Sequence, residues 1–319
     1  MPDQSRVLVI AHRGASGERP EHTLESYRRA IEQGADYIEP DLVMTSDGVL
    51  IARHENEIGG TTDVEQHPEF AHRRRTQVID GETVSGWFTE DFTLSEIKTL
   101  RARERLPHLR PANRDFDGRF EVPTFEEVLG LARNAKSSDK TTIGVYPETK
   151  HPAHFASLGL EQEEAVLETL ARFDYEKAGS PVFIQSFDPK NLRQLRRMTH
   201  LPLVQLLEHE VGDLGVIAEY ADAIGIAKTL ATEEVVASAH RLGLLVHVWT
   251  FRAENEFLPA DLRRGRDPAA HGDLEAEIVR YLARGMDGFF TDFPAIGVRA
   301  RDAAASSARF PRSNPSTSR

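Results

Sequence analysis

The chain has 319 residues, and its 39 Lys and Arg against 51 Asp and Glu give a formal net charge of −12 at pH 7. This acidic balance excludes proteins that bind nucleic acid or anionic membranes through a broad basic face. The chain has no cysteine, which excludes disulfides, thiolate metal sites and cysteine nucleophiles. Because an α/β barrel takes about 250 residues, the length allows one such domain with chain to spare.

No apolar segment approaches the ~20 residues that are needed to span a bilayer. The apolar stretch near the start, residues 7–11, is too short for the core of a signal peptide. We therefore expect a cytoplasmic protein without stable membrane association. If a leader has been removed from the sequence, the expected location is instead periplasmic or secreted.

Short apolar runs rich in Val and Ile alternate with segments of helical periodicity. Several runs are apolar on successive residues, which is typical of parallel strands covered on both faces. The predicted strands cover residues 7–11, 37–43, 143–148, 182–186, 203–207, 223–227, 244–249 and 287–291. Eight strands that alternate with helices predict a (β/α)8 TIM barrel within residues 1–298, and an open doubly wound sheet is the alternative.

The predicted helices follow the strands along the chain. The first begins after the N-cap Thr23 and ends at Gly34. Others are predicted at residues 124–134, 161–172, 188–199, 232–242 and 273–284. The helix after strand 203–207 has the weakest pattern.

Two segments do not fit the strand–helix repeat. After the second strand a turn leads into a hairpin arm at residues 49–53, and residues 55–121 then form a long polar stretch. Structureless loops of that length are uncommon, so we predict a small insertion subdomain on the C-terminal rim of the barrel. Residues 299–319, rich in Ala, Ser, Pro and Arg, predict a disordered tail.

Two acidic residues of the second strand point to a metal site. Glu39 and Asp41 are separated by one residue and therefore face the same way. Two such carboxylates at a barrel mouth cannot both stay ionised without a cation between them. Glu148, at the end of the third strand, is a candidate third ligand. Oxygen ligands favour a hard divalent cation, Ca²⁺ or Mg²⁺.

The first strand ends in His12-Arg13-Gly14, at the face where TIM barrels carry their active sites. Arginine offers a bidentate fork to an anion, histidine offers a titratable proton, and Gly14 would let the backbone approach a ligand. Lys150 adds an ammonium group near the same face. The hairpin would bring His54 close to His12, so that the two imidazoles act as general acid and general base.

In chain order, these residues resemble the motifs of the glycerophosphodiester phosphodiesterase family. The resemblance runs from residue 7 to about 296. The matching segments are 12–14, Pro20-Glu21-His22-Thr23, 39–41, 47–54, 146–150, 185–188, 248–250 and 287–294. The insertion and the run 53–57 are most similar to the bacterial periplasmic-type branch, which usually carries a signal peptide. Two positions depart from the common pattern: His22 replaces Asn, and Glu55 replaces Asp.

The resemblance implies roles for the site residues. Glu39, Asp41 and Glu148 would bind one divalent cation, Ca²⁺ or Mg²⁺, with Glu21 supporting them. Arg13 and Lys150 would hold the phosphate. His12 would act as base and His54 as acid, or the reverse. Trp249 and Phe251, near the end of the seventh strand, would form an apolar wall against the glycerol carbons.

The implied reaction is metal-dependent hydrolysis of small glycerophosphodiesters, such as glycerophosphocholine or glycerophosphoethanolamine, to an alcohol and sn-glycerol 3-phosphate. The attacking group is either water or a neighbouring glycerol hydroxyl. An alternative is a phospholipase-D-like barrel that acts on lysolipids or sphingolipids, although no basic amphipathic stretch is evident. A retaining glycosidase is disfavoured because only Trp249 offers an aromatic platform for a sugar. The preferred head group and the oligomeric state stay open.

Overall fold

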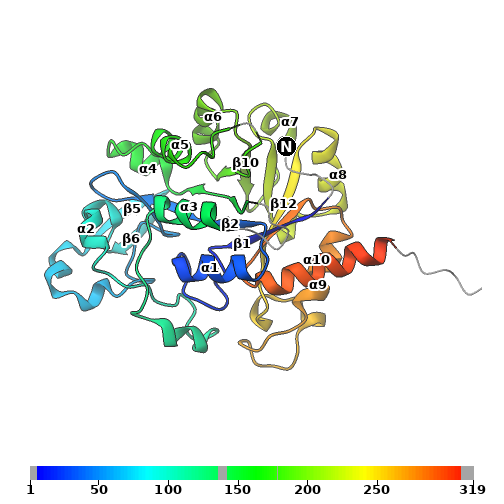
Figure 1. Cartoon of the computed structure of the whole chain (residues 1–319), viewed down its shortest axis with the longest axis horizontal. Helices are drawn as coiled ribbons and strands as arrows, with labels where there is room; N and C mark the ends of the chain where they lie inside the picture. The colour runs from blue at the N-terminus through cyan, green and yellow to red at the C-terminus, as the bar shows by residue number, and fades with distance from the viewer. Residues whose placement is uncertain (1–5, 136–141, 178, 310–319) are drawn as a thin grey trace, which may run out of the picture.

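The structure is a computed structural model that describes residues 6–135, 142–177 and 179–309. Its parallel strands form a closed barrel surrounded by helices (Figure 1). Closure is shown by β1 (Leu8–His12), which pairs in parallel with β2 (Tyr37–Glu39) on one side and with β13 (Gly288–Thr291) on the other. The predicted TIM barrel is therefore confirmed, and the open sheet is excluded.

The remaining barrel strands follow in chain order around the ring. They are β9 (Ile184–Ser186), β10 (Leu203–Leu207), β11 (Ala223–Ala227) and β12 (Leu245–Phe251). The observed bounds of β10 and β11 coincide with the predicted ones. Side chains on successive residues of these strands are buried, because one face packs inside the barrel and the other against helices.

Two barrel strands are interrupted at a proline. The predicted strand 37–43 consists of β2 and β3 (Asp41–Met44) with Pro40 between them. The predicted strand 143–148 consists of β7 (Gly144–Val145) and β8 (Glu148–Thr149) with Pro147 in the gap. Proline has no N–H to donate to a ladder, but its carbonyl still accepts. The backbone N–H of Glu148 donates to the Pro40 oxygen at 2.9 Å, so the two broken strands stay joined.

The helices cover the outside of the barrel. Their bounds are α1 (Leu24–Glu32), α3 (Phe125–Asn134), α4 (Pro152–Ser157), α5 (Gln162–Arg172), α6 (Pro189–Met198), α7 (Leu214–Ile217), α8 (Glu233–Arg241), α9 (Leu274–Leu282) and α10 (Pro294–Arg309). The predicted cap of the first helix is present, because the Thr23 side chain accepts from the Ser26 N–H. Single 3₁₀ turns lie at 228–230, 255–257 and 260–262. Helix α7 is a single turn, which explains its weak sequence pattern.

The hairpin and the insertion after the second strand are both folded. Strand β4 (Leu50–Ala52) pairs antiparallel with β3, as the hairpin arm predicts. The segment 55–121 contains the antiparallel pair β5 (Arg75–Ile79) and β6 (Glu82–Gly86), the short helix α2 (Leu94–Ile97), and 3₁₀ turns at 64–66, 68–73, 89–91 and 111–116. In Figure 1 this segment, coloured from blue to cyan and green, lies to one side of the barrel, near α1, α3 and α4.

The predicted disordered tail from residue 299 is wrong for residues 299–309. These residues form the last turns of α10, which packs against α9 and β1. Arg301 is 4% exposed, and its guanidinium donates to Asp36 at 2.6 Å. The alanines that suggested low complexity are also strong helix formers. Residues 310–319 lie outside the described residues.

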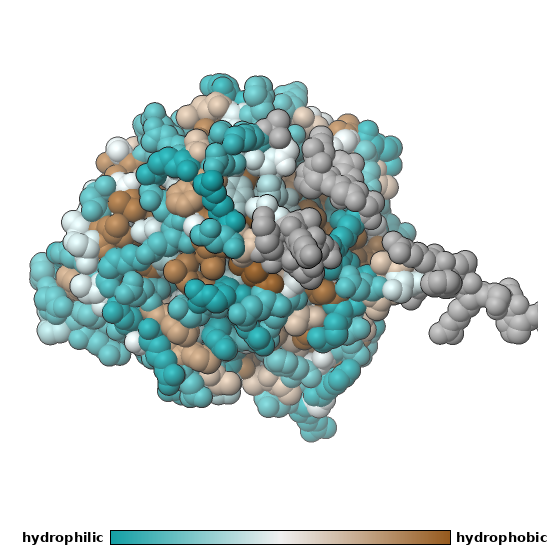
Figure 2. Space-filling view, viewed as in Figure 1, coloured by the Kyte–Doolittle hydropathy of each residue, from teal (hydrophilic) through white to brown (hydrophobic). Residues whose placement is uncertain are grey.

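The described part of the chain contains no helix that is both long enough and apolar enough to cross a membrane. Hydrophilic side chains cover most of the face shown in Figure 2, and apolar side chains are scattered among them.

A buried histidine inside the barrel gives a pH dependence of folding stability. His247 on β12 is fully buried, and its Nδ1 lies 2.6 Å from the Tyr146 hydroxyl. Burial lowers the pKa of His247 from 6.5 to about 4. Between these values the unfolded chain binds the proton and the folded chain does not, so the free energy of unfolding falls as the pH falls. The contribution of His247 is about 3 kcal/mol between pH 6.5 and pH 4.

We expect the free energy of unfolding of His247→Gln to depend less on pH than that of the wild type, by the contribution of His247. Urea unfolding of the wild type and the variant from pH 7 to pH 4.5 measures it. His209→Gln is the control, because the His209 side chain is 87% exposed. A variant that keeps the full wild-type slope would show that His247 is protonated in the folded protein.

Candidate active site

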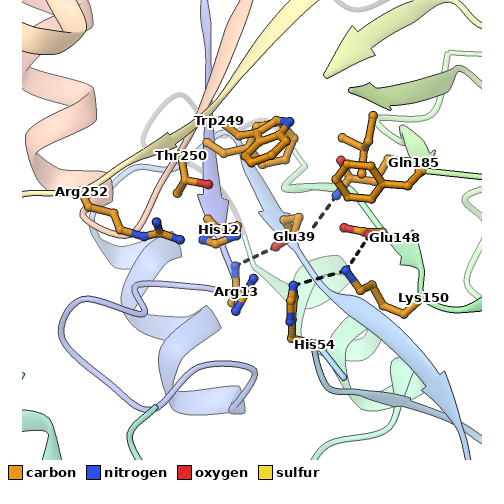
Figure 3. A pocket seen from close by; sticks show the side chains of 13 residues that line it. His12, Arg13, Glu39, His54, Glu148, Lys150, Gln185, Trp249, Thr250 and Arg252 are labelled. Carbon is orange, nitrogen blue, oxygen red and sulfur yellow. Dashed lines mark hydrogen bonds and ion pairs between the residues drawn. The ribbon is translucent and has the colours of Figure 1, made fainter. Parts of the chain in front are cut away.

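A pocket opens at the C-terminal ends of the barrel strands, where most of the site residues predicted from the sequence converge (Figure 3). Its walls mix titratable, amide and apolar side chains. The lining residues are His12, Arg13, Glu39, His54, Glu148, Lys150, Gln185, Phe187, Leu206, Trp249, Thr250, Arg252 and Phe290. They come from most of the barrel strands and from the hairpin arm, so the pocket exists only in the closed barrel.

Three buried carboxylates meet at the pocket. Each of Glu39, Asp41 and Glu148 has an oxygen within 4.8 Å of the others, and their exposed fractions are 1%, 1% and 6%. Burial and the neighbouring negative charges raise the pKa of Glu39 well above its usual value. Burial also raises the pKa of Glu148, to about 8. For Asp41 burial acts in the same direction, but Lys150, His54 and Arg13 hold its pKa well below the usual value.

These carboxylates fit a divalent cation. Asp41 Oδ1 is buried and has no hydrogen-bond partner, although the other oxygen accepts from His22 Nε2 at 2.9 Å. A buried carboxylate oxygen without a partner is costly unless a cation lies against it. Carboxylate oxygens are also the ligands that Mg²⁺ and Ca²⁺ prefer.

Neighbouring side chains fix the orientation of the carboxylates. His22 is fully buried, and its Nδ1 lies 2.7 Å from the Tyr27 hydroxyl, so its ring holds Asp41 from behind. Glu39 accepts from the Arg13 backbone N–H at 2.8 Å and from Gln185 Nε2 at 3.0 Å. The departure from Asn at His22 therefore supplies a ring nitrogen to a candidate metal ligand.

The loop after β1 takes an unusual backbone conformation. Arg13 has φ +60° and Gly14 has φ +88°, a region that L-residues with side chains rarely adopt. A Cβ at Gly14 would overlap Ser26 of α1. We expected this glycine to admit a ligand. The structure shows instead that it admits the helix, and that the turn aims the Arg13 N–H at Glu39.

His12 is held by the carboxylate that directly follows the last strand. Its Nδ1 lies 2.6 Å from Asp292 Oδ1, and Asp292 Oδ2 accepts from Arg110 at 2.5 Å and from Arg252 at 3.0 Å. Burial lowers the pKa of His12 to about 4, helped by Arg13 and opposed by Asp292. A neutral imidazole that donates from Nδ1 to Asp292 keeps a lone pair on Nε2.

His54 has a parallel arrangement. Its Nδ1 lies 2.5 Å from Glu55 Oε1, and its Nε2 lies 3.3 Å from Lys150 Nζ. Burial lowers the pKa of His54 to about 3, with further lowering by Arg13 and Lys150. Lys150 also contacts Glu148 at 2.9 Å, so it links the second imidazole to the carboxylate cluster (Figure 3).

The other three predicted site residues have different surroundings. Trp249 lines the pocket edge-to-face with Phe187, at 6.0 Å between ring centroids. Glu21 contacts Arg13 at 3.2 Å rather than a member of the carboxylate cluster. The prediction for Phe251 is wrong: it is fully buried and packs against Tyr281 and Phe289.

A β-bulge explains the error at Phe251. The register between β12 and β13 shifts between Val248 and Phe251. In a regular strand, Trp249 and Phe251 would face the same side, but an irregularity changes that alternation. Trp249 therefore lines the pocket while Phe251 enters the core behind the sheet.

The sequence interpretation missed the residues that support the two imidazoles. Asp292 lies within segment 287–294, which matches a family motif, and Glu55 replaces the Asp that is common in the family. The sequence alone assigned a role to neither residue. Arg105, which contacts Glu55, and Arg110, which contacts Asp292, belong to the insertion, where no spacing or motif distinguishes them. Their partners are far away in the chain: Arg110 and Asp292 are 182 residues apart.

The chain is similar to known proteins over most of its length. The family model described as the glycerophosphoryl diester phosphodiesterase family matches residues 12–296. A glycerophosphodiester phosphodiesterase of Arabidopsis thaliana is 35% identical in an alignment that covers 91% of this chain and 84% of the relative.

Two solved structures share the fold. A Silicibacter pomeroyi protein, provisionally described as a glycerophosphoryl diester phosphodiesterase, has a TM-score of 0.71 at 26% identity and is matched over 96% of this chain and 95% of its own. A phosphodiesterase of Oleispira antarctica has a TM-score of 0.68 at 19% identity, with 92% and 96% covered. With a family match over nearly the whole chain and a relative above 30% identity, the chain belongs to the glycerophosphoryl diester phosphodiesterase family.

Proposed function

We propose that the protein hydrolyses glycerophosphodiesters to an alcohol and sn-glycerol 3-phosphate in a reaction that depends on a divalent cation. The observation that carries this proposal is a pocket whose wall holds two imidazoles, each supported by a carboxylate, next to a cluster of three buried carboxylates of which two line the pocket. The Arabidopsis relative is named for this activity, and the Oleispira phosphodiesterase was solved with the product sn-glycerol-3-phosphate.

Glu39, Asp41 and Glu148 would hold the cation. When bound, it would supply positive charge to the phosphoryl oxygens, where negative charge grows in the transition state. Whether Ca²⁺ or Mg²⁺ serves is part of the test below.

Arg13 and Lys150 are the protein's own cationic groups that bind the phosphate. Both cations line the pocket, and both are held by carboxylates in the free protein, Arg13 by Glu21 and Lys150 by Glu148. Preorganised cations at a site shielded from water stabilise a phosphoryl group without reorganisation cost. Trp249 and Phe187 then offer apolar surface to the glycerol carbons.

His12 and His54 carry the protons. In the simplest division, His12 Nε2 takes the proton of the attacking hydroxyl, from water or from the neighbouring glycerol hydroxyl, as the P–O bond to the alcohol breaks. If the glycerol hydroxyl attacks, the product is a cyclic phosphate, and a water molecule opens that ring in a second step to give sn-glycerol 3-phosphate. His54 gives a proton from Nε2 to the leaving alcohol oxygen. A bound anionic diester would favour the imidazolium form of His54, and Glu55 stabilises that form.

A substrate panel tests the proposal. We expect release of sn-glycerol 3-phosphate from glycerophosphocholine and glycerophosphoethanolamine, loss of turnover with EDTA, and recovery with Ca²⁺ or Mg²⁺. The same panel includes lysophosphatidylcholine, sphingomyelin and a chromogenic glycoside. Cleavage of the lipids without cleavage of the water-soluble diesters would favour the phospholipase-D-like alternative, and glycoside cleavage alone would exclude a phosphodiesterase.

A further inference from the structure

Two arginines of the insertion reach both candidate catalytic histidines through carboxylates. Arg105 contacts Glu55, the partner of His54, and Arg110 contacts Asp292, the partner of His12. The two arginines lie on one short segment, residues 104–113, whereas their carboxylate partners stand just after the hairpin arm and just after the last barrel strand. One segment of the insertion therefore touches both sides of the site.

Arg105 binds two carboxylates at once. Its Nη1 and Nη2 donate to the two oxygens of Glu55 at 2.9 and 2.7 Å. Its Nε and Nη2 donate to the two oxygens of Glu21 at 2.7 Å each. Since Glu21 also accepts from Arg13, Arg105 is connected to His54 on one side and to a phosphate-binding arginine on the other. Bidentate arginine–carboxylate pairs fix orientation as well as distance.

Arg110 is more deeply buried, at 7% exposure, and uses its whole guanidinium. Nη2 donates to Asp292 at 2.5 Å, Nε to Glu254 at 2.6 Å, and Nη1 to the Ser16 carbonyl at 2.9 Å. Ser16 lies in the loop that follows His12. Arg110 thus ties together the loop after β1, the loop after β12 and the carboxylate that holds His12.

The segment that carries the arginines is itself braced. The carboxylate of Glu104 accepts from the Leu106 N–H at 2.7 Å and from Asn113 Nδ2 at 2.8 Å. The Arg110 N–H donates to the Leu106 carbonyl at 2.8 Å, which closes a turn between the two arginines. A braced turn keeps the two guanidinium groups at a fixed separation.

We propose that Arg105 and Arg110 are positioning residues for the proton transfers, so that the insertion holds both imidazoles in place through Glu55 and Asp292. A carboxylate that is itself fixed holds the imidazole in one orientation and one tautomer, with the proton on Nδ1 and Nε2 available to the substrate. A carboxylate that can rotate does neither. The proposal rests on the proposed function, because it concerns the same two histidines.

The test uses Arg105→Met and Arg110→Met in the full chain with glycerophosphocholine. We expect each variant to lower kcat by about 10- to 100-fold with less than about threefold change in KM, the range found when partners behind ligating or catalytic groups are removed. Arg105→Lys and Arg110→Lys keep the positive charge but lose the bidentate geometry of the guanidinium, and we expect their kcat to lie between those of the wild type and the methionine variants. They also serve if a methionine variant fails to fold.

Arg73→Met is the matched control. Arg73 belongs to the same insertion and forms a bidentate pair with Glu96 at 2.6 and 2.9 Å, but its partner does not contact an imidazole of the site. We expect this variant to keep the wild-type kcat. A loss as large as that of Arg105→Met would show that any damage to the insertion lowers activity, and would overturn the positioning role.

A double-mutant cycle and an activity-free measurement complete the test. In a Glu55→Gln background, adding Arg105→Met should cost little further kcat, because the arginine acts through that carboxylate. Nitrogen-15 NMR of histidine-labelled protein should show mixed Nδ1–H and Nε2–H tautomers at His54 in Arg105→Met and at His12 in Arg110→Met. Wild-type tautomers and wild-type kcat in both folded variants would overturn this inference. A wild-type protein that cleaves no glycerophosphodiester would instead contradict the proposed function, and the NMR measurement would still test the positioning role.

Discussion

Replacement of His12 by alanine is expected to lower kcat for glycerophosphocholine by about 10²–10⁴-fold, the contribution that general acid–base catalysis makes. The His12 imidazole donates from Nδ1 to Asp292, which leaves Nε2 free to accept a proton. Alanine leaves no base at that position. Steady-state kinetics with a coupled assay for glycerol 3-phosphate measures the effect. His54→Ala is expected to fall in the same range.

Two comparisons make the His12 result interpretable. His209→Ala removes a histidine whose side chain is 87% exposed and should leave kcat unchanged. A leaving group such as p-nitrophenolate needs no proton, so the variant that lacks the general acid should recover part of its rate with a p-nitrophenyl diester. Turnover of His12→Ala at the wild-type rate would contradict the assignment of the site.

The second large effect is expected for Glu39, whose replacement should abolish cation binding and with it hydrolysis. A ligand that binds only the folded state stabilises it by about 2.7 kcal/mol at one hundred times its Kd. We therefore expect Ca²⁺ or Mg²⁺ to raise the Tm of the wild type and not that of Glu39→Ala. Without the cation the variant should unfold at the same temperature or higher, because one of three clustered carboxylates has been removed.

Calorimetric titration with each ion and thermal unfolding with EDTA or excess ion measure this effect. Glu39→Gln keeps an oxygen acceptor for the Arg13 N–H and separates loss of charge from loss of that hydrogen bond. Glu219→Gln is the control, because the Glu219 side chain is 69% exposed. An unchanged ion affinity in Glu39→Ala would move the cation away from the three-carboxylate cluster.

Most of the barrel could be predicted because buried parallel strands are apolar on successive residues. Strand 223–227 shows this pattern without polar interruption and strand 203–207 shows it with one glutamine, Gln205, and the bounds of both were predicted without error. The pattern fails where an element is short or gains stability from tertiary contacts. Helix α7 is one turn long, and residues 299–309 are helical although their composition suggested a tail.

The site was predictable where its residues are spaced by two along a strand and therefore share a face. Glu39 and Asp41 were placed on one face by their spacing, and the structure brings them to Glu148. Phe251 was misplaced because the bulge that reverses its face leaves no mark in the sequence. Arg105 and Arg110 were not predictable, because a long-range contact between an insertion and the barrel follows from the three-dimensional path of the chain.

The closure of the barrel between its first and last strands also bears on synthesis. His12 and its carboxylate Asp292 are 280 residues apart, and β1 lacks one neighbour until β13 is made. At ribosomal rates of about 5–20 residues per second, this interval lasts roughly 15 to 60 seconds. The first strand must wait that long with one edge unpaired, and His12, the proposed base, has no orienting partner during that time. The contact that orients His12 therefore forms only after residue 292 has been made, and a chain truncated before Asp292 lacks the group that orients His12.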